Sequence, residues 1–181
     1  MRPARSILAL LAAAALLQSQ AAVAQGQCLT EAEVTGMAAF SLPSALEGVM
    51  KRCQPSLSPR GFFATNGPAM VQRYGVGKDA AWPAAKAAFL KLGADRNDQT
   101  MRQVSRLSDE ALKPFVEGMV EQMVGDQIKP SSCVAIEQVS SLLEPLPARN
   151  TSQLIGFIVT LVESGKPDGK SRMPICKGPL P

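Results

Sequence analysis

The chain has 181 residues, a formal net charge of +4, no histidine, and only 4% aromatic residues. Without histidine, serine–histidine and cysteine–histidine catalytic arrangements are excluded, and the usual zinc sites lose their main ligand. So few aromatic side chains provide no stacking platform for bases, and we therefore expect no nucleic-acid partner.

Residues 1–24 are predicted to be a signal peptide. Arg2 and Arg5 precede an apolar run over residues 7–17, and the small-residue pattern Ala-Val-Ala follows at 22–24. The run is much shorter than the ~20 residues that cross a bilayer, and no later segment is long and uncharged enough to do so. We therefore expect a periplasmic or secreted protein whose mature chain has no transmembrane segment.

Residues 25–164 are predicted to form one all-α domain, because apolar residues recur at spacings of three and four and no segment alternates as a strand would. Breaks at Pro, Gly and Ser divide the domain into expected helices over residues 30–40, 43–52, 67–74, 80–92, 97–106, 109–127, 132–144 and 150–164. Residues 165–181 are rich in Gly, Pro and Lys and are expected to form an irregular tail that Cys176 ties down.

Side chains that can cap a helix mark several of the expected boundaries. Thr30, Ser108 and Asn150 each precede an expected helix and can accept a hydrogen bond from its first turn. Gly93 is expected to end its helix as a left-handed cap. The segment 74–78, Tyr-Gly-Val-Gly-Lys, lacks the spacing of a phosphate loop and is expected to be a turn that ends a helix.

Four cysteines, none in a Cys-x-x-Cys pair, predict two structural disulfides and neither a metal site nor a cofactor. The expected helices 30–40 and 43–52 would form an antiparallel hairpin, with Cys28 and Cys53 side by side at its open end. This argument favours the pairs Cys28–Cys53 and Cys133–Cys176. The alternative pairs are Cys28–Cys176 and Cys53–Cys133.

Two sets of apolar residues are candidates for a binding surface. In the helix 109–127 an apolar stripe repeats at spacings of three and four, formed by Leu112, Phe115, Val116, Met119, Met123 and Val124. Met119 and Met123 could line a groove for an apolar ligand, although methionines at this spacing are favoured as core. Trp82, the only tryptophan, could also mark a binding surface, but we favour a core or rim position.

Charged residues are unevenly distributed along the chain. Basic residues dominate positions 73–106, and acidic residues dominate positions 107–144. We expect the two segments to attract each other within the fold, the alternative being that they face a partner. Glu117 and Glu121, one helical turn apart, could act as an acid–base pair, but a solvated helix face is favoured.

Several short stretches resemble a group of small exported proteins of unknown function from alphaproteobacteria, especially sphingomonads. They are Gln-Cys-Leu-Thr followed by Leu-Pro and a second cysteine, DAAWPAAKAAFLKL, a cysteine followed by PLPARNT, and a final Pro-x-Cys. The resemblance implies export, paired cysteines and a helical fold, and it carries over no active-site residue.

We therefore favour a non-catalytic binding or interaction protein of the periplasm or medium, with a role such as envelope maintenance. Its partner would be another protein or an apolar small molecule. One alternative is a histidine-free hydrolase of the glycosidase kind, with two carboxylates among Glu117, Glu121, Glu137 and Glu144 converging in a pocket. A second alternative is a periplasmic stress chaperone.

Overall fold

A computed structural model describes residues 28–94, 99–166 and 173–176, so the predicted signal peptide lies outside the described residues. The predicted all-α class is confirmed, because the described residues form helices and no strand apart from an isolated bridge between Leu29 and Ile175. None of the described helices is long and apolar enough to cross a membrane.

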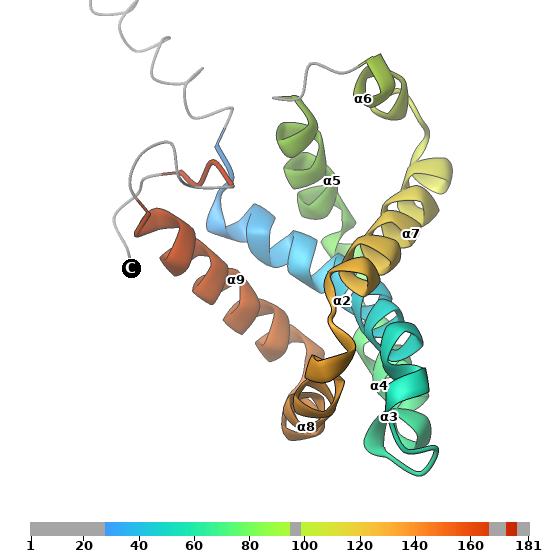
Figure 1. The fold of residues 1–181 in the computed structure, drawn as a ribbon. Helices are drawn as coiled ribbons and strands as arrows, with labels where there is room; N and C mark the ends of the chain where they lie inside the picture. The colour runs from blue at the N-terminus through green and yellow to red at the C-terminus, as the bar shows by residue number, and fades with distance from the viewer. Residues whose placement is uncertain (1–27, 95–98, 167–172, 177–181) are drawn as a thin grey trace, which may run out of the picture.

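The helix α2 (Glu31–Cys53) runs through the middle of the molecule and contacts α4, α5, α7 and α9 (Figure 1). Its length differs from the prediction, which placed two helices over 30–40 and 43–52. Pro43 lies inside α2 and is buried. Proline removes one backbone donor and costs about 3 kcal/mol in a helix interior, and packing against neighbouring helices on several sides offsets that cost here.

The remaining helices follow in chain order, and most lie close to their predicted positions. They are η1 (Gln54–Ser56), α3 (Phe62–Thr65), α4 (Gly67–Gly75), α5 (Lys78–Ala94), α6 (Gln99–Val104), α7 (Asp109–Gln127), η2 (Pro130–Ser132), α8 (Cys133–Leu143) and α9 (Ala148–Ser164). The short helix α3 was not predicted. Pro114 lies within α7 without ending it.

The predicted boundaries are confirmed in part. Thr30 caps α2, and the turn between α4 and α5 contains Gly77 at a φ of +83°, a backbone conformation that glycine adopts without strain. Ser108 lies at the N-cap position of α7, but its side chain accepts no capping hydrogen bond there, and two further capping predictions are wrong. Gly93 lies inside α5, and Asn150 lies inside α9, which begins two residues earlier at Ala148.

The largest core cluster joins α2, α5 and α7. Phe40 of α2 is fully buried, and its ring centroid lies 4.7 Å from that of Trp82 of α5. Leu112, Val116 and Val120 of α7 complete the centre of this cluster. The single tryptophan is therefore an anchor that holds α5 against the central helix.

The four cysteines form two disulfides, as predicted, but the favoured pairing is wrong and the alternative pairing is correct. Cys28 is bonded to Cys176 and Cys53 to Cys133, with Cα–Cα distances of 4.9 and 5.4 Å. Because α2 is one continuous helix of 23 residues, Cys28 and Cys53 lie at opposite ends of a rod about 35 Å long. A bridge between them is geometrically impossible, and each cysteine is paired with one from the C-terminal half.

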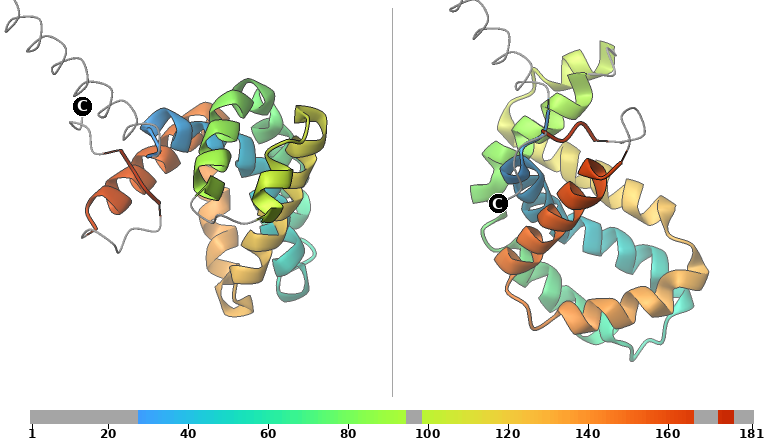
Figure 2. Two further views of the ribbon diagram at one scale, coloured as in Figure 1. Left: turned by 90° about the horizontal axis from the view of Figure 1, so that it is seen from above. Right: turned by 90° about the vertical axis from the view of Figure 1, so that its left-hand side faces the viewer.

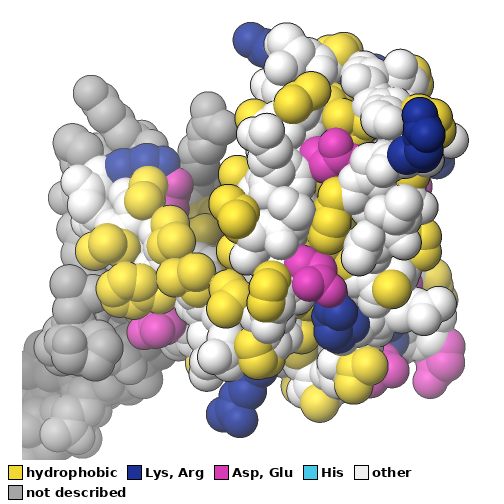
Figure 3. All heavy atoms as spheres, turned by 90° about the horizontal axis from the view of Figure 1, so that it is seen from below, with side chains coloured by type: hydrophobic (Ala, Val, Ile, Leu, Met, Phe, Trp, Pro, Cys, Tyr) yellow, Lys and Arg dark blue, Asp and Glu magenta, His cyan; other side chains and the backbone are white. Residues whose placement is uncertain are grey.

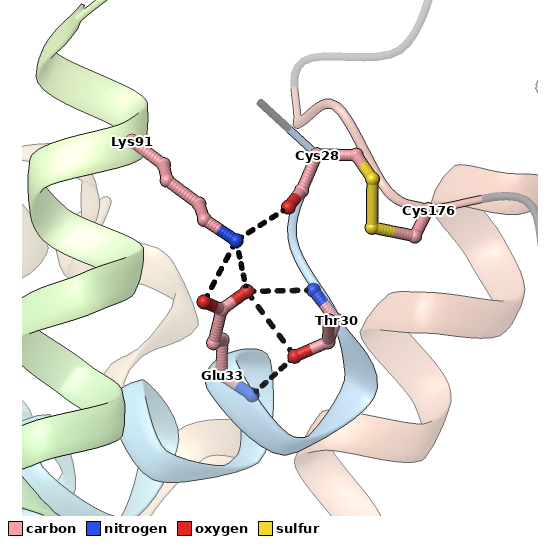
Figure 4. Close-up of polar contacts among 5 residues, drawn as sticks. All are labelled: Cys28, Thr30, Glu33, Lys91 and Cys176. Atoms are coloured by element: carbon pink, nitrogen blue, oxygen red, sulfur yellow. Dashed lines mark hydrogen bonds and ion pairs between the residues drawn. A yellow bond between two sulfur atoms is a disulfide. The ribbon is translucent and has the colours of Figure 1, made fainter. Parts of the chain in front are cut away.

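A polar clamp joins the start of α2 to α5 (Figure 4). Thr30 and Glu33 form a capping box, and the Lys91 ammonium donates to the Glu33 carboxylate at 2.8 Å and to the Cys28 carbonyl at 2.9 Å. Burial raises the pKa of the Glu33 carboxyl, but the hydrogen bonds from Lys91 and Thr30 outweigh it and hold that pKa below its usual value. The Cys28–Cys176 bridge closes the same corner.

The predicted attraction between the basic and acidic segments is confirmed by three ion pairs in which a basic residue of the first segment meets an acidic residue of the second. Their N–O distances are 2.6 Å for Lys78–Glu117, 2.6 Å for Lys86–Asp109 and 2.8 Å for Arg73–Glu144. These side chains are partly exposed, so solvent screens each pair and its contribution to stability is small. The pairs orient α4 and α5 relative to α7 and α8.

Candidate functional site

The helix α9 has its apolar face turned away from the protein. The residues that it buries are small or polar: Thr151, Ser152, Gly156 and Thr160. Large apolar residues on the other side are about half exposed, at 45% for Leu154, 45% for Phe157, 48% for Ile158, 47% for Leu161 and 53% for Val162. Amphipathic helices of globular proteins normally bury the apolar face, so this orientation is reversed.

Close packing between α9 and α2 explains why the small face points inward. A Cβ atom at Gly156 would collide with the Oγ1 and Cα atoms of Thr35 on α2. Near the start of α9 a residue of α4 also packs closely: the Tyr74 hydroxyl donates to the Leu143 carbonyl and lies 3.2 Å from the Thr151 hydroxyl. Only small side chains fit between helices this close, so the large apolar residues of α9 occupy the opposite face.

The helix α8, which precedes α9 in the chain, also exposes large apolar residues. Val134 and Val139 are 56% and 55% exposed, and Leu142 is 77% exposed. With the left side of the molecule toward the viewer, α9 runs in front of α2 and α8 crosses below it (Figure 2). Seen from below, hydrophobic side chains border a hollow between the lobe at the left, which contains α9, and the column formed by α8 (Figure 3).

We call this region the α8–α9 apolar surface. It consists of the eight residues Val134, Val139, Leu142, Leu154, Phe157, Ile158, Leu161 and Val162.

The α8–α9 apolar surface carries almost no charge. The only charged residue of α8, Glu137, accepts a hydrogen bond from the Phe63 backbone N–H at 3.0 Å and is thereby turned toward α3. In α9 the charged residues are confined to the ends, with Arg149 in the first turn and Glu163 in the last, where Glu163 pairs with Lys166. The central two turns of the exposed face are neutral.

The predicted binding residues are divided between the core and a second apolar stripe. Trp82 is 4% exposed, so it belongs to the core and forms no surface. Met119 and Met123 are 38% and 49% exposed, beside Phe115 at 42%. The favoured core position is therefore wrong for Met119 and Met123, because the buried face of α7 is formed by Leu112, Val116 and Val120, with Val124 partly buried beside them.

The four candidate carboxylates are each engaged by a different donor. Glu117 pairs with Lys78 at 2.6 Å, Glu121 with Lys51 at 3.2 Å, Glu144 with Arg73, and Glu137 with the Phe63 amide. A cavity of about 820 Å³ lies between the end of α2, α3 and α7, and Glu121 is the only one of the four that lines it. The remaining lining is mixed, with apolar residues such as Met50 and Phe63 and the charged residues Glu47 and Lys51.

No group of three or more Asp, Glu, Cys or His side chains that could hold a metal ion occurs within the part of the chain that the structure describes. All four cysteines are in disulfides.

The exposure of the large apolar residues of α9 was not predicted from the sequence, although one pattern in the sequence indicates it. Thr151, Ser152, Gly156 and Thr160 share one side of the helix, and a side of small residues indicates close helix packing.

No family model, curated protein or solved structure matches this chain.

Proposed function

We propose that the protein is a non-catalytic, exported binding protein that docks another polypeptide on the α8–α9 apolar surface. The observation that carries this proposal is the reversed orientation of α9, which exposes five large apolar side chains. Contiguous apolar patches of this kind are uncommon on monomeric proteins and mark interaction sites. The spacing of Leu154, Phe157, Ile158 and Leu161 is the i, i+3, i+4, i+7 pattern by which helices anchor in a partner.

Two disulfides are consistent with an oxidising compartment, and together with the N-terminal signal pattern they support a periplasmic or secreted location. The hydrolase alternative has less support, because the four carboxylates have separate partners. The chaperone alternative requires that unfolded clients bind in preference to a folded partner.

Photo-crosslinking in the cell that makes the protein tests the proposal. A benzophenone amino acid replaces Leu161, which is 47% exposed, and the matched control carries it at Val76, which is 78% exposed in the turn after α4. We expect a discrete crosslinked adduct from position 161 and none from position 76. Equal adducts from both positions, or none from position 161, would contradict the proposal. A smear of many masses that intensifies on heating would favour the chaperone.

A further inference from the structure

We infer that the partner docked on the α8–α9 apolar surface is a second copy of this chain, in a two-fold symmetric dimer. The inference rests on the proposed function and names its partner. Three properties of the surface carry it: its area, its lack of charge and its shape.

The area matches what a stable dimer needs. Exposed fractions of 45–77% for the eight residues correspond to on the order of 700 Å² of surface per copy, taking ~180 Å² for a fully exposed large apolar residue. Two such surfaces together approach ~1,400 Å², which lies within the ~1,200–2,000 Å² of stable interfaces. The five residues of α9 alone would fall short of that range, so α8 must take part.

The lack of charge favours an identical partner. Two copies of a positively charged chain repel each other, but the repulsion is weak where the facing surfaces carry no charge. Glu137 is turned toward the Phe63 amide, and the charged residues of α9 lie at its ends. Contact between copies therefore desolvates no unpaired charge at the centre, whereas a charged partner would lose hydration without gaining an ion pair.

The shape of the surface would allow two copies to fit against each other. The surface contains a ridge, the exposed side of α9, which is about 25 Å long, and a hollow between α9 and α8 (Figure 3). A two-fold axis beside α9 would set the ridge of each copy into the hollow of the other. Such isologous contacts form closed dimers, the commonest oligomers of soluble proteins.

Light scattering after size exclusion, with the exported, disulfide-bonded chain between ~1 and 100 µM, tests the inference. We expect the mass of a dimer for the wild type and for the control Val76→Glu. Leu161→Glu and Leu142→Glu each place two charges in the interface and should raise the dimer dissociation constant at least 100-fold. Both positions are exposed in the single chain, so far-UV circular dichroism and the melting temperature of the dilute protein should be unchanged.

The outcomes separate this inference from the proposed function. A wild-type monomer at all concentrations, or a dimer that survives both glutamate substitutions, would overturn the inference. If the crosslinked adduct from position 161 has a mass other than twice that of the chain, the docking function stands and the identical partner is wrong. A monomer without any adduct contradicts both.

Discussion

Replacing Cys53 and Cys133 together by alanine would remove the bridge between the end of α2 and the start of α8. These cysteines are 80 residues apart in sequence, and for a loop of that length the chain-entropy relation gives about 4.5 kcal/mol of stabilisation. The Cys28–Cys176 bridge already shortens the unfolded chain, which lowers the expected loss to about 4 kcal/mol. For a domain of this size the melting temperature should fall by roughly 8–16 °C.

Urea unfolding followed by far-UV circular dichroism measures this loss and also its origin. Without the bridge the unfolded chain expands, so the dependence of unfolding free energy on urea should become steeper. The control Val116→Ala creates a cavity at a core residue that is 4% exposed, and it should lower stability without changing that slope. A loss below about 1 kcal/mol, or an unchanged slope in the double variant, would refute the reasoning.

Two further predictions concern helix packing and pH. Gly48→Ala should destabilise the fold by about 1–2 kcal/mol, because the new Cβ atom would collide with the backbone carbonyl of Glu121. Gly118→Ala has open space around it and should stabilise the fold by about 0.5–1 kcal/mol. Thermal unfolding of the two variants measures both changes. Since the folded pKa of Glu33 lies below its usual value of 4.5, the ion pair with Lys91 stabilises the fold above that pH and is lost as the pH falls through the folded pKa. Glu33→Gln should therefore lose less stability than the wild type between pH 5 and 3 in urea titrations, and identical losses would contradict this.

Much of the fold could be predicted from local patterns. Helix periodicity, the Thr30 cap and the turn around Gly77 depend on residues close in sequence, and each is confirmed. The error at Pro43 has a different origin. A proline in that context ends an isolated helix, and only packing against α4, α5, α7 and α9 allows α2 to continue. The wrong disulfide pairing followed directly from that error.

The candidate surface was harder to predict, because periodicity identifies an amphipathic helix without identifying the face that is buried. In α7 the buried face is set by contacts with Phe40 and Trp82, which leaves Met119 and Met123 exposed. In α9 the close approach of α2 at Gly156 determines which face points inward. Both outcomes depend on contacts between residues that are far apart in sequence.

The Cys28–Cys176 bridge also closes the chain between these two cysteines into a covalent ring, with the two Cα atoms 4.9 Å apart. Every peptide bond between these cysteines lies inside the ring. A protease that cuts once in the exposed segment 58–60 would therefore release no fragment, and the helices on both sides of the cut would stay tethered. A molecule nicked in this way keeps its two parts covalently joined through Cys28–Cys176, and Cys53–Cys133 ties the segments on either side of the cut a second time.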